Sequence, residues 1–224
     1  MKQESSVIIV AGGKGVRMNS QIPKQFIEIG GKPVLMHTIN QFKAYSTDIH
    51  IILVLPSEQI NYWNDLCAKH SFSVMHTIVS GGEARFFSVK NGLEKVITKY
   101  VGIHDGVRPL VSLSTINRCF DEVKKVDAVV PVVDLVDSIR YAENNDNSNT
   151  VDRTKFKLVQ TPQVFNTHVL KESYQLPYSE NFTDDASVVE NAGYQVKLVE
   201  GNRENIKITT EIDLKIAELF LKSI

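Results

Sequence analysis

The chain has 224 residues, and its 25 basic and 26 acidic side chains give a formal net charge of −1. This length allows one large α/β domain or two small ones with a sizeable buried core. Because the charges nearly cancel, the composition argues against nucleic acid or a membrane surface as a partner. Cys67 and Cys119 lie far apart without a C-x-x-C motif, so we expect two free thiols in a cytoplasmic protein.

Short β-branched runs alternate with helical patterns along the chain. The strand candidates are residues 7–10, 51–55, 74–79, 101–104, 128–133 and 195–199. Helical i, i+4, i+7 spacing relates Leu35, Ile39 and Phe42, and again Val89, Leu93 and Val96. Such alternation predicts an α/β fold, with a Rossmann-like, mostly parallel sheet and helices on both faces.

The segment of residues 134–160 interrupts this alternation. Two alternating stretches, 138–141 and 155–159, flank an Asn-rich polar cluster at 143–149, which predicts a long protruding β-hairpin. Such a hairpin has too little apolar surface to be stable alone. A mobile surface loop is the alternative interpretation.

The last helix carries its own start signal. Thr210 is followed by Asp213 three residues later, as in a capping box, and Ile216, Leu219 and Phe220 then share one face. We therefore expect a C-terminal helix that begins just after Thr210.

The most informative segment follows the first strand, where residues 11–18 read AGGKGVRM. Glycines allow the backbone N–H groups to approach an anion, and Lys14, Arg17 and Lys24 add positive charge, which suits a polyphosphate. The segment matches neither the Walker pattern nor G-x-G-x-x-G, because Met18 stands where the last glycine of the latter would be. A plain glycine-rich turn with surface lysines remains the alternative.

This segment, followed by Pro-Lys-Gln-Phe at 23–26, resembles the signature of nucleotidyltransferases that load CTP onto a sugar-alcohol phosphate. Over nearly its full length the chain is similar to the 2-C-methyl-D-erythritol 4-phosphate cytidylyltransferase family. The supporting segments are 81–85 with Ser88, 104–109, 150–153, 160–163, 182–187, 200–201 and 205–209.

The resemblance implies the nucleotide-diphospho-sugar transferase type of fold, in a single domain over residues 1–224. It implies that CMP is transferred from CTP to 2-C-methyl-D-erythritol 4-phosphate, with release of pyrophosphate, in non-mevalonate isoprenoid precursor synthesis. It also implies a homodimer, in which an arm at about residues 134–160 embraces the second subunit.

The resemblance further assigns the site residues. It places CTP against Ala11, Gly12, Gly13, Lys14, Gly15, Gly82, Glu83, Ser88 and Asp105. It makes Arg17, Lys24 and Lys207 the catalytic cations, and it places the acceptor phosphate against Ser138, Arg153, Thr161, Thr183 and Lys207. Asp105 would also hold Mg²⁺, an ion for which one or two protein carboxylates suffice. A helix N-cap or a loop salt bridge with Arg108 is the alternative role of this aspartate.

Some assignments stay open. The Asp-Gly-Val-Arg sequence at 105–108 departs from the commoner Asp-Ala-Ala-Arg of this family, and Asp-x-Val-Arg also occurs in ribitol 5-phosphate cytidylyltransferases. Ribitol 5-phosphate is therefore an alternative acceptor, and a catalytically silent nucleotide-binding regulator is a second alternative. Arg85 is expected either to match the family arginine or to pair with Glu83 at the surface, and His104 is expected to be structural.

Overall fold

A computed structural model describes residues 4–12, 22–143 and 147–222. The strands of its central sheet are β1 (Ser5–Val10), β4 (His50–Leu55), β5 (Thr77–Ser80), β6 (Tyr100–Asp105), β7 (Ala128–Asp134), β10 (Lys157–Val159), β11 (Gln163–Asn166) and β12 (Lys197–Glu200). In the described part of the chain they form an eight-stranded sheet in the order β10-β7-β11-β6-β1-β4-β5, with β12 also paired to β7. The pairs β1–β4, β1–β6, β4–β5 and β7–β12 are parallel, whereas β10 and β11 run antiparallel to their neighbours. The predicted mostly parallel sheet is confirmed.

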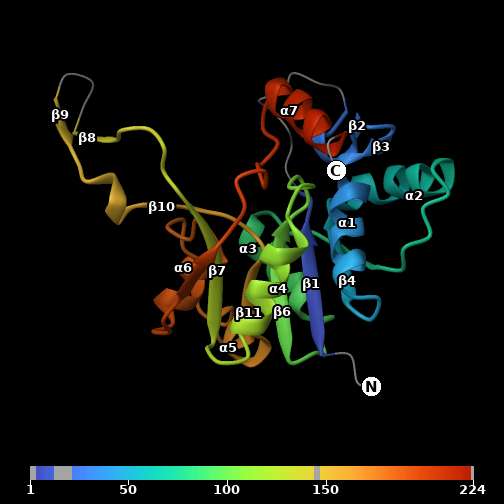
Figure 1. The fold of residues 1–224 in the computed structure, drawn as a ribbon. Coiled ribbons are helices and arrows are strands. Elements are labelled where there is room, and N and C mark those ends of the chain that lie inside the picture. The colour runs from blue at the N-terminus through green and yellow to red at the C-terminus, as the bar shows by residue number, and fades with distance from the viewer. Residues whose placement is uncertain (1–3, 13–21, 144–146, 223–224) are drawn as a thin grey trace.

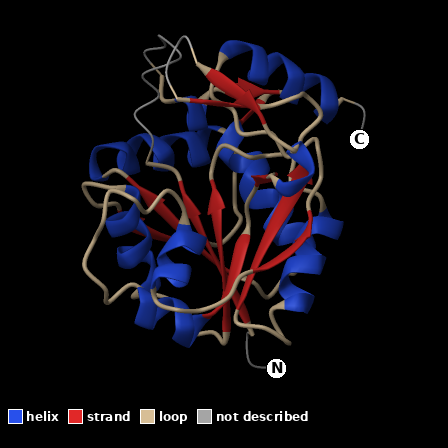
Figure 2. Cartoon of the chain, turned by 90° about the vertical axis from the view of Figure 1, so that its left-hand side faces the viewer, coloured by secondary structure: helices blue, strands red, loops and turns tan. Residues whose placement is uncertain are grey.

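Helices cover both faces of this sheet (Figure 2). One face carries α1 (Val34–Tyr45), α2 (Ile60–Lys69) and α4 (Leu113–Glu122), and the other carries α3 (Arg85–Leu93), α5 (Thr167–Ser173) and α6 (Asp185–Asn191). Alternation along β1 explains the division, because Val7 and Ile9 belong to the core under the first group and Ile8 to the core under the second. Among the described residues, no helix has both the length and the hydropathy that a membrane span requires.

A smaller layer lies beyond the carboxyl ends of the parallel strands (Figure 1). It contains the short pair β2 (Glu28–Ile29) and β3 (Lys32–Pro33) and the helix α7 (Glu211–Leu221). As predicted, α7 begins with a capping box in which Thr210 and Asp213 satisfy each other's backbone groups. Its Ala217 packs with Ile29 and Ile208 in a separate apolar cluster. This layer therefore covers the edge of the sheet at which ligands bind in open α/β folds.

The arm is present, but one of its predicted strands is wrong. β8 (Arg140–Ala142) pairs antiparallel with β9 (Ser148–Thr150), and the hairpin projects away from the body (Figure 1). The expected second stretch, 155–159, does not join this hairpin. After the 3₁₀ turn η4 (Arg153–Lys155), β10 pairs instead with Val132–Asp134 of β7. The more apolar stretch therefore joins the main sheet, and the hairpin of the arm is shorter than predicted.

One further strand was not expected, and the bounds of others differ from expectation. β11 was not predicted, although it lies between β6 and β7 and its Val164 and Phe165 are fully buried. Only four residues long, it shows too little periodicity to stand out in the sequence. β5 begins at Thr77 rather than at residue 74, β12 spans Lys197–Glu200 rather than residues 195–199, and β1 begins at Ser5 rather than at residue 7.

Candidate active site

A cavity of about 530 Å³ opens at the carboxyl ends of β1, β4, β5 and β6. These strands run parallel, so the loops that follow them meet at one edge of the sheet. The predicted residues that line the cavity are Ala11, Gly12, Lys24, Gly82, Glu83, Ser88, Asp105 and Lys207. Residues separated by nearly 200 positions in the sequence therefore surround one space.

Asp105, the last residue of β6, faces three cations, of which Arg85 and Lys207 also line the cavity. Arg108 Nε and Lys207 Nζ each lie 3.1 Å from its Oδ2 atom, and Arg85 Nη2 lies 3.9 Å from Oδ1. Burial alone would raise the pKa of Asp105, but these three cations hold it well below its ordinary value. The carboxylate is therefore ionised throughout the neutral range.

A network of hydrogen bonds through His104 and Thr161 supports the backbone of Asp105 on the side away from the cavity. His104 Nε2 lies 3.1 Å from the Arg108 carbonyl oxygen, which can only accept, so the ring proton is on Nε2. His104 Nδ1 then accepts from the Thr161 hydroxyl at 3.0 Å, and the same oxygen accepts from the Asp105 backbone N–H at 3.1 Å. Burial lowers the pKa of His104 to about 4, which keeps the ring neutral as this network requires. His104 is thus structural, and Thr161 lies beneath Asp105 instead of lining the cavity.

Lys24 opens the short 3₁₀ turn η2 (Lys24–Phe26), which is anchored through its next two residues. The amide of Gln25 donates to the Ala11 carbonyl oxygen and to Gln59 Oε1, both at 2.8 Å. The buried Phe26 ring stacks on Trp63 of α2, with centroids 6.1 Å apart. These anchors fix the backbone that carries Lys24 at the cavity wall.

The loop after β5 brings a second glycine-rich stretch to the cavity. The backbone N–H of Gly82 donates to Ser88 Oγ at 3.1 Å, which joins the loop to the first turn of α3. A Cβ atom at Gly82 would lie 2.4 Å from Phe87 Cβ, so a glycine is needed for this close approach. The loop is therefore packed closely against the start of α3, and its residues 81–84 line the cavity.

Arg85 does not form the predicted surface pair with Glu83. Its Nη2 atom instead lies 2.6 Å from Oδ2 of the fully buried Asp185, whose Oδ1 accepts from the Tyr174 hydroxyl at 2.7 Å. Burial alone would lower the pKa of Arg85, but Asp185, and to a lesser degree Asp105, raise it above its ordinary value. Asp185 had no predicted role. Its signal in the sequence was a second aspartate directly after the helix cap Asp184.

Other predicted residues lie elsewhere. Ser138, Arg153 and Thr183 are exposed and do not line this cavity; the first two belong to the arm and its approach. Arg153 donates to the Val136 carbonyl oxygen within the arm. Gly13, Lys14, Gly15 and Arg17 fall outside the described residues.

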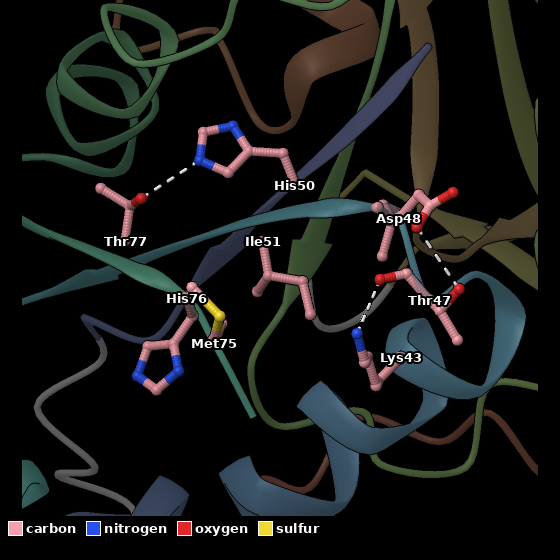
Figure 3. A pocket seen from close by; sticks show the side chains of 9 residues that line it. Lys43, Thr47, Asp48, His50, Ile51, Met75, His76 and Thr77 are labelled. Carbon is pink, nitrogen blue, oxygen red and sulfur yellow. Dashed lines mark hydrogen bonds between the residues drawn. The ribbon is translucent and has the colours of Figure 1, made fainter. Parts of the chain in front are cut away.

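A second cavity, of about 540 Å³, lies at the start of β4 and β5 (Figure 3). His50 and Thr77 hydrogen-bond across it at 3.1 Å, and Lys43 donates to the Thr47 carbonyl oxygen at its rim. This is the amino edge of the strands, away from the loops that bind ligands in folds of this type. Lys43 is therefore a lysine remote from Asp105, and its substitution can serve as a control for substitutions of the lysines in the first cavity.

The donor set around Asp105 is compatible with Mg²⁺. Among the described residues no group of three or more His, Cys, Asp or Glu side chains is arranged to hold a metal. Mg²⁺ usually uses one or two protein carboxylates and completes its shell with water and substrate phosphates. The single ionised carboxylate of Asp105 suits an ion that arrives with a triphosphate.

Comparison with known proteins gives one consistent result. Residues 5–223 match the family model of IspD, 2-C-methyl-D-erythritol 4-phosphate cytidylyltransferase. The proteins of that name from Bacteroides thetaiotaomicron and Porphyromonas gingivalis (strain ATCC 33277) are 56% and 49% identical, over 99% and 100% of this chain and the whole of each relative. The solved structure of this cytidylyltransferase from Thermus thermophilus has a TM-score of 0.79 and 31% identity, over 98% of this chain and 99% of that one. The 4-diphosphocytidyl-2C-methyl-D-erythritol synthase of Anaerococcus prevotii gives a TM-score of 0.82 and 28% identity, over 98% of both chains.

Proposed function

Because this chain belongs to the 2-C-methyl-D-erythritol 4-phosphate cytidylyltransferase family, we propose that the cavity around Asp105 is its active site. The chain is a nucleotidyltransferase that transfers CMP from CTP to 2-C-methyl-D-erythritol 4-phosphate, in non-mevalonate isoprenoid precursor synthesis. The products are 4-diphosphocytidyl-2-C-methyl-D-erythritol and pyrophosphate. The observation that carries the placement is the convergence of Lys24, Arg85 and Lys207 with Asp105 at one edge of the sheet.

The chemistry requires positive charge more than it requires a base. A phosphate oxygen of the acceptor bonds to the α-phosphorus of CTP while the bond to the pyrophosphate oxygen breaks. A phosphate monoester has a second pKa of about 6, so the attacking group is largely ionised at neutral pH. Lys24 and Lys207 neutralise the two anions, hold them together and stabilise charge on the leaving group. Lys14 and Arg17, outside the described residues, have the same proposed role.

The nucleoside half of CTP lies between the two glycine-rich loops. Ala11 and Gly12 form one wall of this subsite, and Gly82, Glu83 and Ser88 form the other. The position of both loops in the wall of the cavity supports this placement.

Asp105 holds Mg²⁺ in this proposal. Held by this carboxylate, Mg²⁺ would supply positive charge beside the triphosphate. The low pKa of Asp105 supports this role, since the carboxylate needs no deprotonation before it coordinates a metal.

The arm provides contacts for a second copy of the chain. Val136, Tyr141, Phe156 and Leu158 expose 64%, 61%, 47% and 52% of their surfaces, and apolar groups gathered in this way on one segment favour a protein–protein contact. We propose a homodimer in which the arm carries Arg153, with Ser138 beside it, toward the acceptor phosphate in the partner's cavity. Thr183 of the loop before α6, with Thr161 behind Asp105, supports that subsite.

The chain works in the cytoplasm in this proposal. Cys67 and Cys119 are both free, and burial raises their pKa values to about 11 and about 12. Thiols of this kind are poorly reactive and suit a reducing compartment.

The test is Mg²⁺-dependent release of pyrophosphate from CTP, with 2-C-methyl-D-erythritol 4-phosphate and ribitol 5-phosphate run in parallel. Turnover is expected with the former. Lys207→Met should lower kcat by about 10²-fold, as when one transition-state donor is removed, and Lys43→Met at the opposite edge of the sheet should leave kcat unchanged. Turnover with ribitol 5-phosphate alone would overturn the acceptor assignment. CTP binding without turnover on either acceptor would indicate a silent nucleotide-binding regulator.

A further inference from the structure

Arg85 is held at the cavity by the carboxylate of Asp185. Its Nη2 atom lies 2.6 Å from Asp185 Oδ2 and 3.9 Å from Asp105 Oδ1. One guanidinium nitrogen thus lies between two carboxylates, and the buried one has the closer contact. The ionic partner of Arg85 is therefore Asp185, although the Arg85 side chain also lines the cavity.

Asp185 is built as a rigid anchor. Its side chain is fully buried, and its second oxygen accepts from the hydroxyl of Tyr174, itself only 1% exposed. The Tyr174 ring stacks on Phe86, the neighbour of Arg85, with centroids 4.6 Å apart. Asp184 supplies the cap of α6, so helix capping does not explain the acid at 185.

The two oxygens of Asp105 have different surroundings. Oδ2 has Arg108 and Lys207 at 3.1 Å each, which is hydrogen-bonding distance. Oδ1 has Arg85 at 3.9 Å, which is beyond it. A short movement of Arg85 toward Asp105 would close this gap and surround the carboxylate with cations.

We propose that Asp185 is a positioning residue that keeps Arg85 away from Asp105 Oδ1 and so leaves this oxygen to a divalent metal ion bound with CTP. The inference rests on the proposed function of the cavity. An arginine without its own anion prefers a close pair with the nearest carboxylate, and a metal ion would then have to displace it. Losing a residue that orients a metal ligand typically costs about 10–100-fold in metal affinity.

The experiment measures Mn²⁺ binding to the full-length protein by electron paramagnetic resonance in the presence of saturating CTP, so it does not depend on turnover. Asp185→Asn should weaken Mn²⁺ binding by about tenfold or more. Tyr174→Phe removes the other hydrogen bond of the same carboxylate but leaves Arg85 anchored, so its Mn²⁺ affinity should stay near the wild-type value. Unchanged Mn²⁺ affinity in folded Asp185→Asn would overturn the inference.

A double variant separates capture of Asp105 from general damage. In Arg85→Met/Asp185→Asn no guanidinium is present to cover Asp105, so Mn²⁺ affinity should return toward the wild-type value. If Asp185→Asn alone does not fold, the double variant still decides, because it leaves no unpaired buried charge. Binding that stays weak in the folded double variant would refute the capture of Asp105 by Arg85. Wild-type protein that fails to bind CTP would overturn the proposed function first, which distinguishes the two failures.

Discussion

Replacing Thr161 by valine tests the hydrogen bonds that hold Asp105 in place. The Thr161 side-chain oxygen accepts from the Asp105 backbone N–H at 3.1 Å and donates its proton to His104 Nδ1 at 3.0 Å. Valine has a similar shape but no polar atom. It therefore leaves a buried donor and a buried acceptor without partners.

The expected magnitude follows from those two groups. An unsatisfied buried polar group costs about 1–3 kcal/mol, so with two such groups Thr161→Val should lose about 2–6 kcal/mol of unfolding free energy. In a domain of this size each kcal/mol lowers Tm by about 2–4 °C, which corresponds to a loss of about 4–24 °C. The kcat of the variant should fall as well, because Asp105 loses its support.

The assay is urea denaturation monitored by circular dichroism, with Thr161→Ser as the matched control. Serine keeps the hydroxyl and loses one methyl group, which should cost about 1 kcal/mol. If Thr161→Val is no less stable than Thr161→Ser, the two hydrogen bonds do not support Asp105, and the reasoning is wrong.

Two further predictions concern stability without ligand. Gly82→Ala should lose about 1–3 kcal/mol in urea denaturation, as overpacked sites do, because its Cβ would lie 2.4 Å from Phe87 Cβ. A Cβ at Gly12 meets no atom of the described residues within 4 Å, so Gly12→Ala serves as the control, and equal losses in the two variants would contradict the packing argument. Between pH 6.5 and pH 4 the unfolded chain protonates His104 before the folded one does, because the folded pKa is about 4. As the pH is lowered from 6.5 to 4, the free energy of unfolding should therefore decrease by up to about 3 kcal/mol. His104→Gln should make this decrease smaller. An equally steep decrease in that variant would show that His104 is not its source.

Local patterns in the sequence were sufficient for much of the site. The β-branched run at 7–10 followed by glycines predicted a strand and its loop, and Asp105 was placed at the end of another strand. Because parallel strands end at one edge, this order was enough to bring Ala11, Gly12 and Asp105 together.

Other features depend on contacts that no local pattern records. Asp185 and Arg85 are separated by 100 positions, so neither residue's neighbours reveal the pair. β10 was assigned to the wrong partner because two strands, β7 and β8, compete for it, and only the packing of the whole sheet decides between them. The physical reason is the same in both cases, since tertiary contacts override short-range preference.

Trp63, on which Phe26 stacks, is an intrinsic fluorescence probe close to the cavity wall. Trp63 is the single tryptophan of the chain, it is fully buried, and its indole N–H donates to His76 Nε2 at 3.0 Å. Burial lowers the pKa of His76, so the ring that accepts this bond stays neutral at physiological pH. Lys24 lies two residues before the Phe26 ring that stacks on this indole. If nucleotide binding shifts the backbone of η2, the fluorescence of the unmodified protein is expected to change, with no label added and no residue replaced.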